Sequence, residues 1–343
     1  MLESHMTVTA DTKSRQGRPE DAMPSMGSYW HPIALAAEVV EQPRRFMLLG
    51  EPIVAFRDEQ GVAAFKDLCI HRGTALSLGY ITDGHLTCLY HGWEYDRSGA
   101  CVHIPSLPEG SSIPRKARAI VYRAEERYGL VWVALKDPVA PIPDWPENVW
   151  SNPRYEVFLA ARQTWKANAG RVVENGMDFS HFNFAHKGLT ELADGPVIKP
   201  HPVEVTDYGL HYEYQDSRIT RKYYLYAPFT LHDCKIEANG DTSVLTLIVG
   251  PADSKTSHVY SFIARNHEGA TALENKGQKP LQPDVIAAFE RIMNQDRAIV
   301  ESQRPEEIPL DLRDELHLKV PDATGIAYRR LLARISDSGE FMP

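Results

Sequence analysis

Short runs in which apolar and polar residues alternate dominate the chain from Tyr29 to about residue 135. Residues 52–58 and 62–67 flank a turn that ends in Gly61, and this pattern predicts a β-hairpin. Residues 86–96 and 101–104 predict a second hairpin, and residues 128–135 predict a strand that closes the unit. The first third of the chain is therefore predicted to be all-β.

The remainder mixes strand and helix patterns. A helical segment is predicted to begin near Thr164 and to end at Gly188, a favourable residue for a helix C-terminus. A long helix is predicted at residues 283–303, before Pro305, and one or two short helical segments follow. Between these helices, a curved antiparallel sheet is predicted from runs at residues 201–214, 219–226, 229–238, 243–250 and 257–265.

These patterns predict an α+β protein of two domains. An all-β domain is expected at residues 28–140 and a sheet-and-helix domain at 151–343, joined by a proline-rich linker at 141–150. Residues 1–27 lack periodicity and predict a disordered tail, and their first six letters, MLESHM, resemble the remnant of an expression tag.

Composition narrows the class of protein. The chain of 343 residues is 43% hydrophobic and 24% charged, as in ordinary globular proteins, and its net charge of −9 argues against nucleic acid as the main partner. No apolar run approaches the roughly 20 residues of a membrane span. Of the four cysteines, Cys101 and Cys234 are expected to be free thiols, and no secretory signal pattern is present, which together indicate a cytoplasmic location.

Four residues in the first domain suggest a metal centre: Cys69, His71, Cys88 and His91. Each half of this quartet supplies one thiolate and one imidazole, which suits a Rieske [2Fe–2S] cluster with two cysteines on one iron and two histidines on the other. The alternative is a mixed zinc site, although zinc modules usually pair cysteine with cysteine and histidine with histidine. The pattern favours the cluster.

A second metal site is predicted around His181 and His186. Two histidines and one carboxylate can hold Fe(II) by one face and leave positions open for O₂ and substrate. The two histidines are five positions apart, whereas neighbours on a helix face are three or four apart. The helix is therefore expected to widen or break between them, for example at a π-type bulge.

Asp296 is the candidate carboxylate. It lies on the apolar stripe of the long helix, which is formed by Val285, Phe289, Ile292, Ile299 and Val300. A buried carboxylate without a cation is costly, so it needs a metal or a strong donor. A salt bridge to Arg291 or Arg297 is the alternative, but both lie on other faces of the helix.

The stretches CIHRGTALSLG and CLYHGWEYDRSG resemble the Rieske non-haem iron oxygenases. That resemblance implies a helix-grip catalytic domain with iron held by His181, His186 and Asp296. It also implies that Asp178 bridges His181 to a cluster histidine, His91 of the partner subunit, and that Asn175 lies in the pocket or beside the ligands. A pure electron carrier of the Rieske ferredoxin type would need little beyond the first domain.

The resemblance also implies a function. The chain would be the terminal oxygenase of a homotrimer that receives electrons from NAD(P)H through a ferredoxin and/or flavin reductase and uses O₂. Its length and its RYGLVWVAL and ESQRP stretches are similar to those of vanillate, dicamba and methylxanthine demethylases. We therefore expect N- or O-demethylation of a small molecule, releasing formaldehyde. Ring hydroxylation or cis-dihydroxylation is the alternative, and a carrier protein with structural zinc is an alternative of another class.

Overall fold

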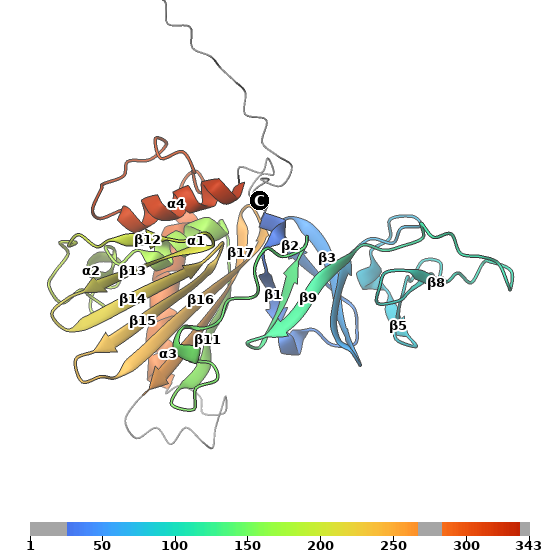
Figure 1. The fold of residues 1–343 in the computed structure, drawn as a ribbon, viewed down its shortest axis with the longest axis horizontal. Coiled ribbons are helices and arrows are strands. Elements are labelled where there is room, and N and C mark those ends of the chain that lie inside the picture. Colours follow the sequence, from blue (N-terminus) through green and yellow to red (C-terminus); the bar gives the residue numbers. More distant parts are fainter. Residues whose placement is uncertain (1–25, 267–282, 337–343) are drawn as a thin grey trace, which may run out of the picture.

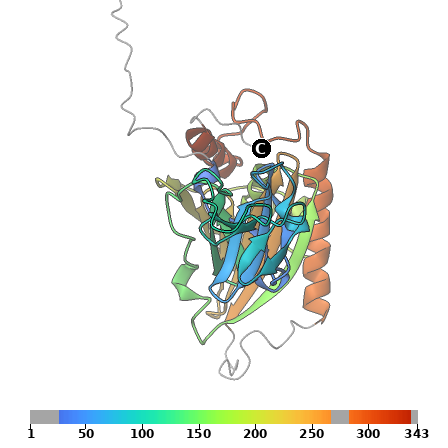
Figure 2. The same ribbon diagram turned by 90° about the vertical axis from the view of Figure 1, so that its right-hand side faces the viewer.

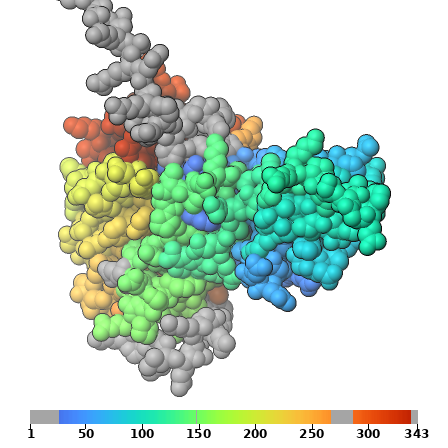
Figure 3. Space-filling model, turned by 45° about the vertical axis from the view of Figure 1, so that its right-hand side comes forward, coloured from blue at the N-terminus to red at the C-terminus, as the bar shows by residue number. Residues whose placement is uncertain are grey.

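The computed structural model describes residues 26–266 and 283–336, and its two domains lie side by side along the longest axis (Figure 1). The first domain contains a six-stranded antiparallel sheet in the order β1-β10-β9-β4-β3-β2. Its strands are β1 (His31–Leu35), β2 (Arg44–Leu48), β3 (Glu51–Asp58), β4 (Gly61–Lys66), β9 (Val121–Arg127) and β10 (Leu130–Ala134). Figure 3 shows this domain as a projection from the larger one.

A small second sheet, in the order β5-β6-β7-β8, forms the outer end of the first domain. Its strands are β5 (Tyr80–Thr82), β6 (His85–Thr87), β7 (Glu94–Tyr95) and β8 (Cys101–His103). The hairpin predicted around Gly61 is present as β3 and β4, whereas the strand predicted over residues 86–96 is interrupted. Its middle leaves the sheet as a loop that carries Cys88 and His91.

The second domain is a seven-stranded antiparallel sheet in the order β11-β17-β16-β15-β14-β13-β12. The strands are β11 (Glu156–Trp165), β12 (Val203–Val205), β13 (Gly209–Gln215), β14 (Ile219–Tyr226), β15 (Thr230–Glu237), β16 (Thr242–Asp253) and β17 (Thr256–Asn266). The helices are α1 (Ala169–Met177), α2 (Phe182–Ala185), α3 (Pro283–Ser302) and α4 (Ala323–Ser336). Figures 1 and 2 show α3 running along one side of the sheet. This is the predicted α+β architecture.

Two predicted elements of the second domain also differ from the structure. The segment near Thr164 is not helical: it belongs to β11, which pairs with β17 along its length, and the helix begins only at Ala169. The side chain of Asn168 caps that helix by accepting a hydrogen bond from the backbone N–H of Gly170 at 3.0 Å. The run at residues 201–214 is two strands, because the chain turns between β12 and β13.

The two faces of the large sheet bury different partners because successive side chains point to opposite faces. On one face, Leu247 and Val249 pack in a core with residues of α1, α3 and α4. On the other face, Ile248 and Phe262 share a core with Trp132 of the first domain. The domains are therefore joined by common apolar packing.

The segment between the domains takes part in this shared core. Ile142, Trp145 and Val149, from the predicted proline-rich linker, are all buried in it. The predicted domain limits stay predictions, and the predicted tail lies outside the described residues apart from Met26 and Gly27, which are buried. Within the described ranges, no helix is long and apolar enough to span a membrane. The cytoplasmic location stays a prediction.

Candidate metal centres

Two loops of similar construction carry the Cys/His quartet of the first domain. The backbone N–H of Gly73 donates to the carbonyl of Cys69, and that of Gly92 donates to the carbonyl of Cys88, each at 2.9 Å. Both glycines have positive φ, +73° and +68°, which favours glycine. A Cβ on Gly92 would also lie 2.9 Å from Pro105 Cγ. Each loop therefore closes tightly around its cysteine.

The loops bring like donors together. The side chains of Cys69 and Cys88 are both buried, and burial raises the pKa of Cys88, with interaction with Cys69 as a further cause. The rings of His71 and His91 lie 4.6 Å apart, and Nδ1 of His71 is buried without a hydrogen-bond partner. A thiol pair beside an imidazole pair fits a centre whose two irons have different ligands better than it fits one zinc ion.

Two aromatic residues contact this quartet. The buried hydroxyl of Tyr95 lies 3.1 Å from Cys69 Sγ, and burial raises its pKa well above the usual value, so the phenol keeps its proton and can donate. Trp93 stacks on His71, with ring centroids 4.4 Å apart. A tyrosine hydroxyl therefore lies beside a cysteine sulfur, and an indole ring packs against one of the imidazoles.

In the second domain, a short helix brings His181 and His186 together. Helix α1 ends at Met177, the chain becomes extended at Asp178, and α2 forms a single helical segment with one histidine at each end. His186 leaves the helical conformation, with φ −113° and ψ 28°. The two rings therefore converge, with centroids 4.9 Å apart. Residues 182–185 form a regular α-helical turn, so the prediction that the helix widens or breaks between the histidines, for example at a π-type bulge, is wrong.

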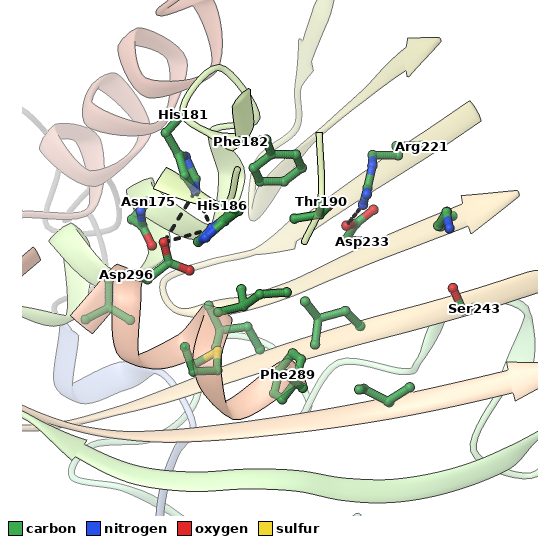
Figure 4. Close-up of a pocket in the computed structure, with 18 of the residues that line it drawn as sticks. Asn175, His181, Phe182, His186, Thr190, Arg221, Asp233, Ser243, Phe289 and Asp296 are labelled. Atoms are coloured by element: carbon green, nitrogen blue, oxygen red, sulfur yellow. Dashed lines mark hydrogen bonds and ion pairs between the residues drawn. The ribbon is translucent and has the colours of Figure 1, made fainter. Parts of the chain in front are cut away.

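Asp296 of α3 completes a cluster of three donors (Figure 4). The two histidine Nε2 atoms are 3.1 Å apart, and Asp296 Oδ1 lies 3.1 Å from His186 Nε2 and 3.4 Å from His181 Nε2. With bonds of about 2.1 Å to one metal ion, neighbouring ligands lie roughly 3.0–3.4 Å apart. The buried Oδ1 accepts no hydrogen bond, which is what a metal ligand requires. The three residues fit one ion.

The outer nitrogens of both histidines have acceptors. Nδ1 of His181 lies 3.2 Å from Asp178 Oδ2, and Nδ1 of His186 lies 3.0 Å from Gln295 Oε1. Donation from each Nδ1–H leaves both Nε2 lone pairs pointing to the centre. Burial opposes the charged form of His181, but Asp178 and Asp296 raise its pKa to about 9. Sequence reasoning missed Gln295, whose only signal is its position directly before Asp296.

The salt-bridge alternative for Asp296 is not present. Arg297 pairs instead with Glu301 at 2.8 Å, and Arg291 is exposed. The buried stripe of α3 differs in detail from the predicted one. Ile299, which was predicted to belong to it, is 42% exposed, and Met293, which was not, is buried. The side chain of Val285 lies outside the described residues.

A cavity of about 220 Å³ opens in front of the three donors. Asn175 and Phe182 lie close to the triad (Figure 4). Met293, Leu247 and Phe289 add apolar wall. Its size is below the 300–1,000 Å³ typical of sites for drug-sized ligands. A small, largely apolar molecule therefore fits beside the candidate metal.

Comparison with known proteins gives matches for both domains. Residues 29–120 match the Rieske [2Fe-2S] domain, and residues 165–226 and 208–338 match the vanillate O-demethylase oxygenase C-terminal domain. Methylxanthine N1-demethylase NdmA of Pseudomonas putida is 28% identical over 90% of this chain and 89% of its own. Methylxanthine N3-demethylase NdmB of the same organism is 30% identical over 82% of each chain.

Solved structures agree with these matches. The structure of NdmA from Pseudomonas putida CBB5 with caffeine has a TM-score of 0.78 at 27% identity, over 91% of this chain and 95% of that one. Dicamba monooxygenase bound to dicamba has a TM-score of 0.71 at 22% identity, over 91% and 96%, and is evidence of a shared fold.

Proposed function

The chain belongs to the Rieske non-haem iron oxygenases, and from this premise we propose that it oxidises an N- or O-methyl group of a small aromatic or heterocyclic substrate. It is a terminal oxygenase subunit, an oxidoreductase of the monooxygenase type. The observation that carries the proposal is the C-terminal match to a vanillate O-demethylase domain in which three residues that could hold a metal ion face a small cavity with apolar walls beside them.

In this proposal His181, His186 and Asp296 hold a mononuclear Fe(II), and Cys69, Cys88, His71 and His91 hold the cluster. When bound, these groups supply O₂ activation and the electrons for it. One oxygen atom enters a methyl C–H bond, and the other leaves as water with two electrons and two protons. The resulting hemiaminal or hemiacetal breaks down to formaldehyde and the demethylated product. Phe182 and Met293 orient the substrate and exclude water.

Electrons come from NAD(P)H through a ferredoxin and/or flavin reductase, which docks at the first domain. The small sheet that carries the cluster loops and helix α2, whose ends carry His181 and His186, lie at opposite ends of the molecule (Figure 1). This separation favours electron transfer between subunits of a homotrimer. Asp178 suits the bridging role, because its side chain is 36% exposed while it contacts His181. His91 of the partner subunit would lie against it.

Exposed apolar side chains near both centres support this contact between subunits. Beside the cluster histidines, Ile70, Leu89 and Tyr90 are 51%, 59% and 61% exposed. Beside His181, Phe184 and Val197 are 72% and 75% exposed and line a shallow depression that also includes His181. Such apolar surfaces commonly mark protein interfaces. Light scattering that gives a monomer at working concentration would contradict the trimer.

Turnover with a borrowed reductase tests the reaction. The enzyme, loaded with both metals, is incubated with NAD(P)H, O₂ and a panel of methoxybenzoates, methoxybenzamides and N-methyl heterocycles, and formaldehyde is measured. We expect formaldehyde in step with substrate loss. Ring-hydroxylated or dihydroxylated products would favour the alternative reaction, and O₂ consumption without product across the panel would count against demethylation.

A further inference from the structure

The end of the cavity away from the triad is lined by cations. Arg221 of β14 lies opposite Lys235 of β15, Lys235 lies opposite Ser243 of β16, and Ser243 lies opposite Arg265 of β17. All four residues line the cavity, so their side chains share one face of the sheet. Figure 4 shows Arg221 and Ser243 on the far side from Asp296. We call these four residues the cationic row.

The carboxylates that pair with the cationic row do not neutralise all of its positive charge. Like charges directly opposite each other on neighbouring strands are destabilising. Arg221 forms a buried ion pair with Asp233, and Lys235 lies 2.7 Å from Glu237, whose side chain is 46% exposed and outside the cavity lining. Among the described residues, no carboxylate lies within ion-pair distance of Arg265, although Glu156 is its strand neighbour.

The cross-strand residues that lie closer to the triad carry less positive charge than the cationic row. Asp233 lies opposite Leu245, which lies opposite Ile263, and beyond them Leu247 lines the cavity. A ligand in this cavity therefore meets cations at one end, apolar walls in the middle and the candidate metal at the other end. A molecule with an anionic group on one side and an apolar methyl group on the other matches that gradient.

The row also lies at the junction of two cavities. A second, more polar cavity of about 750 Å³ shares Thr190, Arg221 and Lys235 with the first. A ligand entering from the second cavity passes these residues before it reaches the triad. The second cavity is lined by Arg218, Arg221 and Lys235 and also by Glu191 and Glu237. The net positive charge of this lining raises the local concentration of anions.

We infer that the substrate carries a carboxylate, which binds Lys235, Ser243 and Arg265 while the methyl group faces the triad. This inference rests on the proposed function and specifies its substrate class. Arg221 keeps its ion pair with Asp233 and adds positive charge to the row without contacting the substrate carboxylate. The anionic group provides affinity and orientation, since a charge-assisted hydrogen bond is about twice as strong as a neutral one.

Calorimetric titration of the metal-loaded enzyme tests the inference without turnover. The probes are 3- and 4-methoxybenzoate and the corresponding methoxybenzamides, which have nearly the same shape and no charge. We expect each benzoate to bind about tenfold or more tightly than its amide, with a preference that weakens as salt is added. Equal affinity within each pair, or no binding of either benzoate at millimolar concentration, would overturn the inference.

Variants locate the effect. Lys235→Gln and Arg265→Gln should each weaken benzoate binding by about tenfold and leave benzamide binding unchanged. Lys222→Gln is the control, because Lys222 follows Arg221 on β14 and its side chain points to the opposite face. An unchanged preference in Arg265→Gln would also overturn the inference.

The two proposals fail in different ways. Benzoates that bind through the row but yield no formaldehyde would remove demethylation and leave the anionic preference intact. A neutral methylated substrate that binds more tightly than every benzoate of the panel and yields formaldehyde would remove the anionic preference and leave demethylation intact.

Discussion

The two candidate metal centres of this chain are built in opposite ways. The first takes all its donors from two loops at the outer end of a small domain, and Tyr90 beside them is 61% exposed. The second takes its donors from α2 and α3, more than a hundred positions apart, and His186 is 1% exposed. An exposed centre can exchange electrons with a partner, whereas a buried one can exclude water from a reaction. The difference in burial therefore suits the first centre to electron transfer and the second to catalysis.

Removing a ligand from the buried centre should separate the two sites most completely. Asp296→Ala takes away the only carboxylate of the triad, so we expect turnover to fall below detection and bound mononuclear iron to be lost. The cluster absorbance and its EPR signal on reduction should be unchanged. Glu290→Ala, an exposed acid of the same helix, is the control. Retained turnover in Asp296→Ala would refute the ligand assignment.

Asp178→Asn tests whether Asp178 takes part in electron transfer between the two centres. The amide keeps the size of the side chain but loses its charge beside His181, so electron transfer should slow by about ten- to a hundredfold. Stopped-flow reoxidation of the reduced cluster in the presence of O₂ and substrate measures this rate. The iron content and the oligomer mass should not change. Asp207→Asn, an exposed acid in a turn, is the control, and equal rates in both variants would exclude the bridging role.

Gln295→Leu should affect the buried centre alone and more weakly. His186 loses the acceptor for its Nδ1–H, which lies 3.0 Å away, so its imidazole is free to rotate. We expect iron affinity to fall about tenfold, at the lower end of the range for such partners. Titration of the metal-free triad with Fe(II) under anaerobic conditions measures it. Asn294→Leu, the exposed neighbour, should bind iron normally.

Tyr95→Phe should have the smallest effect and should change only the exposed centre. Loss of a hydrogen bond worth about 1 kcal/mol to the Cys69 sulfur corresponds to a decrease of about 40 mV in the one-electron reduction potential. Protein-film voltammetry measures the shift. Tyr80→Phe, half-exposed on β5, should leave the potential unchanged, and an unshifted potential in Tyr95→Phe would show that the hydroxyl does not tune the cluster.

The sequence predicted the features that depend on motif spacing or on the periodicity of a single helix. The spacing of Cys69, His71, Cys88 and His91 predicted two loops, and the position of Asp296 on an apolar helix face predicted its approach to the histidines. The helix near Thr164 was predicted wrongly because β11 is stabilised by pairing with β17, about a hundred positions later. Its partner strand cannot be identified from a local pattern.

Contacts that depend on strand register were also beyond prediction. Arg221, Lys235, Ser243 and Arg265 are ordinary strand residues in the sequence, and they form a row only because four strands align. The five-residue spacing of His181 and His186 does require a departure from one long regular helix, but the predicted π-type bulge is absent between them. The chain instead ends α1 early and uses a short α2 whose two ends carry the histidines.

The core shared by Trp132, Trp145 and Phe262 has a consequence for folding cooperativity. Neither domain can unfold without exposing apolar surface of the other, so both should melt in one calorimetric transition. A ligand that binds only the folded state raises the midpoint of that transition. Insertion of the cluster at one end of the molecule should therefore stabilise the substrate cavity at the other end. Two separate melting peaks, only one of them shifted by cluster loss, would contradict this coupling.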